Sequence, residues 1–160
     1  MIRPVTTTDA REIVDIYNEY ILSTTISFET EPLTVEHMQC RIKEISSHCP
    51  YIVWEDDGGI AGYCYAHPWK ERAAYHLTLE TTVYLSPQYF RKGIGTQLMQ
   101  RLIEECRKMG FKVLIACITA DNKASIEMHR QLGFKQVSYF EQVGKKFDKM
   151  LDVVDMQLNL

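Results

Sequence analysis

Residues 75–118 read YHLTLETTVYL SPQYFRKG IGTQLMQRLIEECRKMG FK VLIACI. The first part is rich in Thr, Val, Tyr and Leu, so it predicts a strand over residues 75–85 that ends at a proline. Apolar residues then recur at helical spacing from residue 94 until a glycine at 110, which predicts an amphipathic helix. Residues 113–118 are continuously apolar, which is typical of a strand buried on both faces. This stretch therefore predicts a strand–helix–strand unit at the centre of the fold.

Strand and helix patterns continue on both sides of this unit. Before it they predict a short strand, two amphipathic helices and a hairpin, and after it a helix and two strands. Strands that both precede and follow such a unit favour a mixed α/β sheet over a sandwich or a helical bundle. The predicted elements are a strand at Ile2–Val5, helices from Asp9 and from Thr34 to about Ser46, a hairpin of Tyr51–Trp54 and Ile60–Ala66, a helix at Ala124–Leu132, and strands at Lys135–Val143 and Val153–Leu160 joined by Gly144–Asp152.

Length and composition favour one soluble domain over residues 1–160. The chain has 46% apolar residues and no low-complexity segment, and a chain of this length buries roughly 70% of its unfolded surface. The longest apolar run, residues 113–118, is far shorter than the roughly 20 residues that cross a bilayer. Met1–Pro4 lacks the apolar stretch of a signal peptide. We therefore expect a cytoplasmic protein that does not bind membranes.

The cysteines and the charges narrow the function classes. Five cysteines are present, and none stands two or three residues from another, so neither a disulfide framework nor a zinc site is expected. They are interpreted as free thiols, and a thiolate that carries an acyl group stays open as the alternative. Residues 1–90 carry 6 basic and 13 acidic side chains, whereas residues 91–160 carry 12 and 8, which suits a small anionic ligand. The basic residues are dispersed, so nucleic acid is not an expected partner.

The loop over residues 86–95 is a candidate phosphate site because it joins a predicted strand to a predicted helix. Gly93 and Gly95 lack a Cβ atom, so the backbone there can approach a ligand closely. The first N–H groups of a helix have no internal partner and carry partial positive charge, so a pyrophosphate fits at this end. The loop is neither a Walker loop nor a dinucleotide fingerprint, since Leu98 occupies the place of a third glycine. Two glycines in such a loop also occur for purely structural reasons.

This loop is one of several motifs that follow one another in order along the chain. They are Val83–Pro87, Arg91–Gly95, Asp121–Ser125, His129 and Leu132–Phe134. In residue type and order they resemble the Gcn5-related N-acetyltransferase (GNAT) superfamily over residues 1–160. A second set resembles the phosphinothricin and methionine sulfoximine acetyltransferase group of that superfamily, and it comprises Ser27–Glu29, Arg72–Tyr75, Thr78–Glu80, Gln142–Phe147 and Leu151–Asp152. Phe90 stands where the family usually has Gln or Arg, and Arg91 stands where it usually has Gly.

The resemblance implies a single GNAT-like domain whose mixed, mostly antiparallel sheet carries about four helices and splays between its fourth and fifth strands. It implies that the strand over residues 77–85 is bulged and that acetyl-CoA fills the gap as a pseudo-strand. Val83 and Leu85 would pair with the pantetheine amides, and Asn122 would bond the pantetheine arm. An N–H near Tyr84 or Leu85 would stabilise the oxyanion of the attacked thioester. The pyrophosphate would contact Arg91, Lys92, Gly93, Ile94, Gly95 and Thr96.

Glu80 and His129 are the candidate catalytic side chains. An amine with a pKa near 10 is mostly protonated at neutral pH, so a base must remove a proton before attack. Glu80, on the same strand as Val83, is the candidate base, acting directly or through a water; a solvated or ion-paired Glu80 is the alternative. His129 stands where many relatives carry a Tyr thought to protonate the leaving thiolate, and it either serves that role or only packs and hydrogen-bonds.

A small amino-acid-like acceptor needs a guanidinium or backbone donors for its carboxylate and a tight pocket wall. Arg72 is the expected carboxylate or phosphinate clamp, unless it forms a surface ion pair with Glu71 or contacts a partner subunit. The backbone and ring of the following residues would add donors, and the loop after the first helix would close the pocket. The expected acceptor residues are Phe28, Glu29, Arg72, Ala73, Ala74 and Tyr75.

The sequence therefore predicts an acyltransferase that moves acetyl from acetyl-CoA, without a metal, to the α-amino group of methionine sulfoximine, methionine sulfone, phosphinothricin or a similar small molecule. The acceptor could instead be a protein amino terminus, a lysine or a polyamine, which an acidic pocket and an open cleft would favour. A non-catalytic acyl-CoA-binding module, with Phe90 marking a degraded cofactor site, is the third alternative. Members of this family pair through strands near the carboxyl terminus, so a homodimer is expected.

Overall fold

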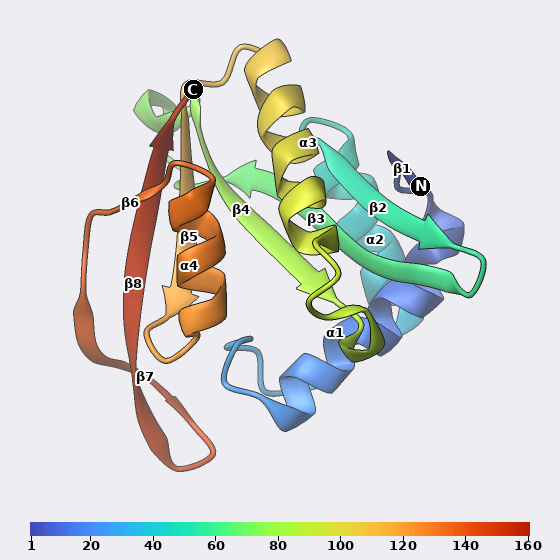
Figure 1. Cartoon of the computed structure of the whole chain (residues 1–160), viewed down its shortest axis with the longest axis horizontal. Coiled ribbons are helices and arrows are strands. Elements are labelled where there is room, and N and C mark those ends of the chain that lie inside the picture. The colour runs from blue at the N-terminus through green and yellow to red at the C-terminus, as the bar shows by residue number, and fades with distance from the viewer.

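The computed structural model describes residues 1–160 and contains one eight-stranded sheet with four α-helices (Figure 1). The strand order is β1-β2-β3-β4-β5-β8-β6, with β7 paired to β8, and every pair is antiparallel except β4 with β5. The mixed α/β prediction is confirmed. The elements are β1 (Ile2–Pro4), α1 (Ala10–Ser23), α2 (Val35–Ser46), β2 (Tyr51–Asp56), β3 (Gly59–Pro68), β4 (Thr78–Leu85), α3 (Ile94–Lys108), β5 (Val113–Thr119), α4 (Lys123–Gln131), β6 (Lys135–Gln136), β7 (Phe140–Lys146) and β8 (Lys149–Asn159).

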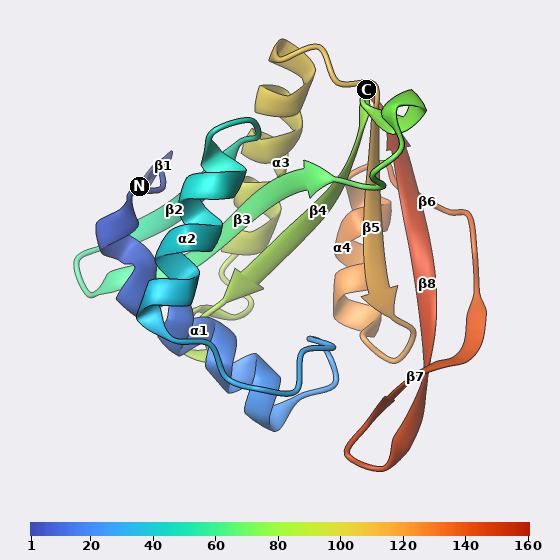
Figure 2. The ribbon, with the colours of Figure 1, turned by 180° about the vertical axis from the view of Figure 1, so that it is seen from behind.

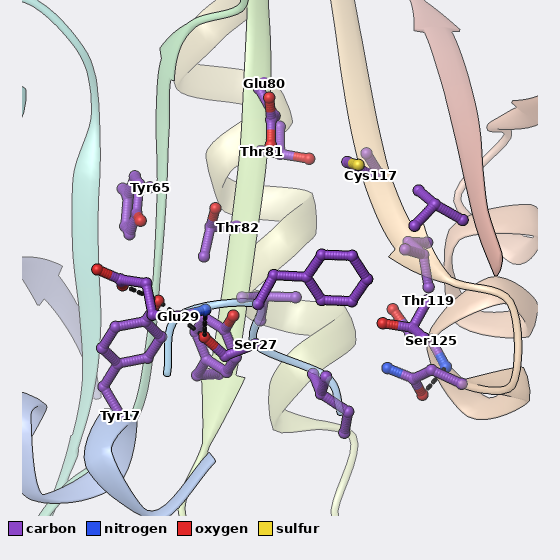
Figure 3. Close-up of a pocket in the computed structure, with 18 of the residues that line it drawn as sticks. Tyr17, Ser27, Glu29, Tyr65, Glu80, Thr81, Thr82, Cys117, Thr119 and Ser125 are labelled. Atoms are coloured by element: carbon purple, nitrogen blue, oxygen red, sulfur yellow. Dashed lines mark hydrogen bonds between the residues drawn. The ribbon is translucent and has the colours of Figure 1, made fainter. Parts of the chain in front are cut away.

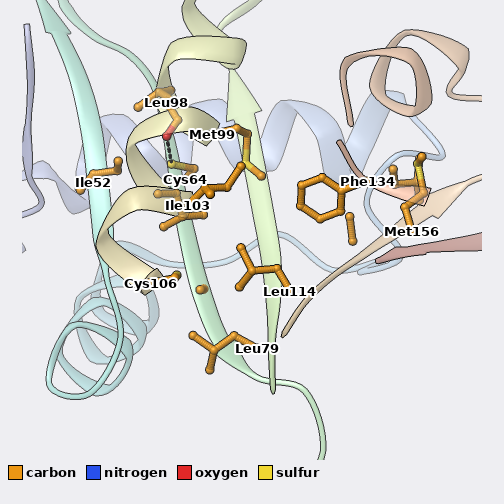
Figure 4. Close-up of a cluster of buried hydrophobic side chains, with 14 of the residues drawn as sticks. Ile52, Cys64, Leu79, Leu98, Met99, Ile103, Cys106, Leu114, Phe134 and Met156 are labelled. Atoms are coloured by element: carbon orange, nitrogen blue, oxygen red, sulfur yellow. Dashed lines mark hydrogen bonds between the residues drawn. The ribbon is translucent and has the colours of Figure 1, made fainter. Parts of the chain in front are cut away.

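Helices cover both faces of the sheet, with α1 and α2 on one face and α3 and α4 on the other (Figures 1 and 2). Side chains alternate along each strand, so a single strand feeds both cores. On β3, Tyr63 packs with Ile13 of α1, whereas Cys64 packs with Leu98 of α3. The larger core lies beneath α3 and continues to β5 and β8 (Figure 4). The sheet is therefore packed on both faces around the place where its strands part.

The pairing of β4 with β5 ends halfway along both strands. The register runs from Thr78 opposite Val113 to Thr81 opposite Ala116, and residues 82–85 and 117–119 have no partner across the gap. The neighbouring ladders are complete, because β3 follows β4 to Leu85 and β8 follows β5 to the end of that strand. The splay predicted between the fourth and fifth strands is therefore confirmed.

The register of β3 with β4 is continuous, so the predicted bulge in the strand over residues 77–85 is wrong. The strand also begins at Thr78 rather than at Tyr75, because residues 73–75 form a 3₁₀ turn. Strand propensity alone did not locate the start of the strand, since an aromatic and Thr-rich sequence suits both a strand and the turn that leads into it.

The carboxyl-terminal strands are joined more closely than predicted. The sequence suggested a connection over Gly144–Asp152, but β7 and β8 form a hairpin with a two-residue turn at Phe147 and Asp148. Both turn residues have positive φ angles, 52° and 56°. Tight hairpin turns require that conformation and usually contain a glycine, which is absent here, so the sequence carried little turn signal. The strand predicted over Lys135–Val143 is interrupted after β6.

No helix in the structure is both long enough and apolar enough to cross a membrane.

The core beneath α3 should determine stability. Leu98 is fully buried in it, whereas Leu22 on α1 is 58% exposed, which makes them a matched pair of helical leucines. We expect Leu98→Ala to lower the free energy of unfolding by about 2–5 kcal/mol, because it removes buried methyl groups and leaves a cavity. Leu22→Ala should change it by less than about 0.5 kcal/mol. Urea denaturation followed by circular dichroism measures both, and equal effects would contradict this placement of the core.

Candidate active site

A cavity of about 550 Å³ opens where β4 and β5 separate (Figure 3). The α1 helix, the loop after it, α2 and β3 line one side, and β5 and α4 line the other. Residues that the sequence predicted and that do line the cavity are Phe28, Glu29, Glu80, Val83, Tyr84, Asn122 and His129. Residues that the sequence reasoning did not assign to a site, and that lie beside them, are Tyr17, Ser27, Arg41, Tyr65, His67 and Cys117.

Glu80 points to the cavity from the face of β4 that α1 and α2 cover. Burial raises the pKa of its carboxyl group; the nearby His67 works against this shift and Asp155 on β8 adds to it. The carboxylate accepts no hydrogen bond from another protein group. A carboxyl group with a raised pKa in a cavity has the properties of a general base that exchanges protons closer to neutral pH.

His129 on α4 is 3% exposed, and its ring is held by its own helix. Its Nδ1 lies 2.8 Å from the carbonyl oxygen of Ser125. A carbonyl oxygen only accepts, so Nδ1–H is the donor, and Nε2 of the neutral ring is an acceptor. Burial lowers the pKa of His129, and its ring meets Phe134 edge to face at 5.0 Å. A neutral ring in this tautomer has no Nε2 proton to give to a thiolate. The geometry favours the packing and hydrogen-bonding alternative over the role of proton donor.

The backbone of β4 presents its odd-numbered residues to the gap. Hydrogen bonds from Ser86 N–H to the Ala61 carbonyl (2.9 Å) and from Trp69 N–H to the Thr78 carbonyl (3.3 Å) lie at the two ends of the β3–β4 ladder. In an antiparallel pair, the backbone N–H and C=O groups of every second residue bond to the partner strand. Even-numbered residues of β4 therefore bond to β3, and the N–H and C=O groups of odd-numbered residues point toward β5.

Val83 and Leu85 consequently turn their N–H and C=O groups toward the missing strand, as the sequence predicted for a pantetheine partner. The Tyr20 hydroxyl already donates to the Leu85 carbonyl at 2.6 Å, which leaves the N–H of Leu85 free. The backbone of Tyr84 faces β3, so of the two oxyanion donors that the sequence suggested, the N–H of Leu85 is the one turned toward the gap. Its ring instead packs against Tyr17 and Tyr20 at 5.1 and 4.8 Å.

The loop before α3 keeps free donors beyond the open end of the gap. Gly93 has a φ of 75°, and the first helical bond runs from Gln97 N–H to the Gly93 carbonyl at 3.1 Å. The N–H groups of Ile94, Gly95 and Thr96 therefore have no partner inside the helix. These groups, with the exposed cations Arg91 and Lys92 nearby, suit a diphosphate, although none of the six predicted residues lines the cavity itself.

Asn122 begins α4 and lines the same cavity. Its side-chain oxygen accepts the Ser125 N–H at 3.3 Å, which caps the helix. Its side-chain NH₂ group remains free to donate to a ligand in the gap. The unpaired β4 backbone, this amide and the start of α3 thus together supply donors and acceptors of the kind that an acyl-CoA needs.

The acceptor side of the cavity contains an ion pair that the sequence did not reveal. Arg41 of α2 donates two hydrogen bonds, each 3.0 Å, to the carboxylate of Glu29. The Tyr17 hydroxyl also donates to Glu29. Burial by itself acts to raise the pKa of Glu29, but the hydrogen bonds from Arg41 and Tyr17 lower it overall, so this carboxylate stays charged.

The loop that carries Phe28 and Glu29 is fastened to the opposite side of the cavity. Thr119 of β5 donates to the Thr25 carbonyl at 2.8 Å, and Lys146 of β7 donates to the Ser27 carbonyl at 2.6 Å. Phe28 also packs so closely on Gly144 that a Cβ atom there would collide with its ring. The loop therefore bridges the two halves of the split sheet and closes one end of the cavity.

Arg72, Ala73, Ala74 and Tyr75 do not line the cavity of their own chain. They lie at the 3₁₀ turn before β4, where Tyr75 meets Trp69 edge to face at 5.3 Å. Arg72 forms no ion pair with Glu71. The guanidinium that the fold brings to the cavity is that of Arg41, and the role predicted for Arg72 stays a prediction.

Cys117 is the cysteine that lies in the cavity, and all five cysteines are free thiols. Burial, with the nearby carboxylates of Asp155 and Glu80, raises the pKa of Cys117 to about 12. A thiol this weakly acidic is protonated at neutral pH, which argues against its carrying an acyl group. No cluster of three or more His, Cys, Asp or Glu side chains is arranged to hold a metal ion.

Comparison with known proteins gives consistent matches. The profile described as "Acetyltransferase (GNAT) family" matches residues 13–134. The chain is 36% identical to the phosphinothricin N-acetyltransferase of Streptomyces viridochromogenes over 152 residues, 95% of this chain and 83% of the relative. It is 33% identical to the L-methionine sulfoximine/L-methionine sulfone acetyltransferase of Salmonella typhimurium over 154 residues, 95% of this chain and 90% of the relative.

Solved structures resemble the chain over its whole length. A putative acetyltransferase from Salmonella typhimurium, solved with its cofactor acetyl-CoA, matches with a TM-score of 0.98 and 33% identity and covers 100% of this chain and 93% of that one. A phosphinothricin acetyltransferase from Sinorhizobium meliloti, solved in complex with acetyl-CoA, has a TM-score of 0.97 and 34% identity and covers 100% and 88%. The chain, with a split sheet whose free backbone groups fit an acyl-CoA, therefore belongs to the GNAT family of acetyl-CoA-dependent N-acetyltransferases.

Proposed function

We propose that this enzyme acetylates the α-amino group of a small amino-acid-like molecule of the methionine sulfoximine, methionine sulfone or phosphinothricin type. The observation that carries the proposal is the cavity of about 550 Å³ beside Glu80, closed at one end by the bridging loop. Relatives named for these acceptors match nearly the full chain, which supports the same chemical class.

Each part of the site has a distinct task in this proposal. Bound acetyl-CoA supplies an acetyl group activated as a thioester. The N–H and C=O groups of Val83, the N–H of Leu85 and the amide of Asn122 orient the pantetheine arm, and the start of α3 holds the diphosphate. A β4 N–H that faces the gap stabilises negative charge on the thioester oxygen, a contribution typically worth about 2.7–4 kcal/mol. Glu80 removes a proton from the acceptor ammonium group.

The bridging loop favours a small acceptor over a polypeptide. Its ties to Thr119 and Lys146 cross the end of the cavity, and the ring of Phe28 narrows it. A protein amino terminus or a lysine within a chain would require this loop to open. A free amino acid can be enclosed without breaking those hydrogen bonds.

A thiol-release assay with a panel of amines tests the proposal after calorimetry has measured acetyl-CoA binding. We expect turnover with methionine sulfoximine, methionine sulfone or phosphinothricin and far less with a lysine peptide or spermidine. Preference for the peptide or the polyamine would replace the proposed acceptor. Acetyl-CoA binding without turnover of any amine would support the non-catalytic alternative that Phe90 suggested.

Glu80→Gln removes the proposed base and leaves a side chain of similar size. We expect kcat to fall about 10²–10⁴-fold, because proton removal by a positioned base typically contributes that much. The affinity for acetyl-CoA should stay near that of the wild type. In the wild type the rate should rise with pH through the raised pKa of Glu80, because only the carboxylate form accepts a proton. Glu104→Gln, on the exposed side of α3, is the control, and unchanged kcat in Glu80→Gln would remove Glu80 as the base.

Arg72 can clamp the acceptor's carboxylate only from a position outside its own chain's cavity, which requires the expected homodimer. If it does so, Arg72→Ala should raise KM for methionine sulfone about tenfold to a hundredfold, since a hydrogen bond to a charged group contributes about 1.5–3 kcal/mol. KM for an amine without a carboxylate should change little. Equal effects on both amines would discard the clamp.

Lys146→Met tests the bridging loop. Lys146 is 5% exposed and donates to the Ser27 carbonyl, and burial lowers the pKa of its amine. Because Met cannot form this bond, we expect the acceptor's KM to rise several-fold while the affinity for acetyl-CoA is kept. The adjacent exposed residue provides the control variant, Lys145→Met. Steady-state kinetics compare the two, and identical acceptor KM values would show that the loop does not depend on this contact.

A further inference from the structure

A histidine lies directly beside the proposed base. His67 on β3 is the cross-strand partner of Glu80 on β4, so both side chains emerge on the same face of the sheet. Both also line the cavity. Nδ1 of His67 lies 3.0 Å from the Pro68 carbonyl oxygen, which makes Nδ1 the donor. Nε2 of the neutral ring is therefore free to accept a proton.

His67 also lines a second cavity of about 360 Å³ on the α2 side of β3. The two cavities share Arg41, Tyr65 and His67. Glu44, His48 and Pro68, which line the second cavity, are exposed, so this cavity reaches the surface. Its lining consists of Arg41, Glu44, Ile45, His48, Cys49, Tyr65, His67 and Pro68. His67 thus stands between the cavity that holds Glu80 and a separate path to solvent.

Proton balance requires such a path. The acceptor enters as R–NH₃⁺ and leaves as an amide with one N–H, while the new C–N bond forms and the C–S bond breaks. Two protons therefore leave the nitrogen, of which one ends on the sulfur of CoA and one must reach solvent. When both substrates fill the cavity between β4 and β5, the proton that Glu80 removes needs another path to solvent.

We propose that His67 accepts this proton from Glu80, directly or through one bridging water, and releases it to solvent through the second cavity. The proposal rests on the proposed function, in which Glu80 is the base. An imidazole is suited to the task because it exchanges protons near neutral pH. His67 then acts as a proton relay that returns Glu80 to its carboxylate form before the next turnover.

The other titratable groups around the pair are less suited to the relay. Asp155 of β8 and Cys117 of β5 face Glu80 from the opposite side of the gap, away from the second cavity, and Cys117 is too weakly acidic to exchange a proton near neutral pH. On the α2 side, Arg41 is paired with Glu29. The remaining titratable groups that line either cavity are Tyr17, Tyr65, Tyr84, Glu44, Cys49, His48 and His129, and none of them is the cross-strand partner of Glu80.

Chemical rescue distinguishes a relay from a structural role. In a dilute buffer without imidazole, we expect His67→Ala to lower kcat about tenfold or more, with KM for the acceptor and affinity for acetyl-CoA unchanged. Added imidazole should restore kcat in a concentration-dependent manner by entering the space left beside the second cavity. His67→Gln keeps most of the side-chain volume without a titrating group, and it should show the same loss. Wild-type enzyme and the exposed α2 variant His37→Ala should not respond to imidazole.

Two results would overturn the relay: kcat unchanged in both His67 variants, or a loss of kcat that imidazole does not restore. Thermal melting and acetyl-CoA calorimetry establish that each variant is folded. If the wild type turned over no amine, the proposed function itself would fail. If the wild type turned over an amine and both His67 variants kept the same kcat, only the relay would be disproved.

Discussion

The separation of β4 from β5 after Thr81 and Ala116 is the constraint on which the rest of the structure depends. A backbone N–H or C=O that is buried without a partner costs free energy, so strands do not normally stop pairing inside a protein. Here each strand is held along its full length by its other neighbour, β3 on one side and β8 on the other. The gap therefore offers a ligand unpaired backbone groups on strands that are each held along their other edge.

The two halves of the sheet are joined by contacts that leave this gap open. Beneath it, the core under α3 includes Leu98, Leu114 and Met156, which come from both sides of the split. Above it, the loop after α1 is tied to β5 and β7 through Thr119 and Lys146. Because both connections are made by side chains or by a loop, the strand edges themselves remain unpaired.

Removal from water explains the electrostatics of the cavity. An aromatic wall that includes Tyr17, Tyr65 and Tyr84 excludes solvent from one side. Burial then disfavours the charged form of each titratable group, so the pKa values of the Glu80 carboxyl and the Cys117 thiol rise and that of the His129 imidazole falls. The same cause yields a basic carboxylate, an inert thiol and a neutral histidine.

The sequence by itself determined most of the elements and the family, because these depend on local order. Helical periodicity located α3, a continuous apolar run located β5, and a cap residue and a following glycine located α4. The position of Glu80 three residues before Val83 placed a carboxylate beside the gap. The tight turn at Phe147–Asp148 was not predicted because it lacks the glycine that marks most such turns.

Only the tertiary structure decided which distant side chains share the cavity. Arg41 occurs in an amphipathic helix where a charged residue normally faces solvent, and His67 lies near the end of a strand with no recognisable motif. Strand register set His67 opposite Glu80, and the packing of α2 brought Arg41 to Glu29, whereas Arg72 was left outside. The physical reason is that periodicity specifies which face of an element is buried, but only the register between strands and the packing between layers specify what that face meets.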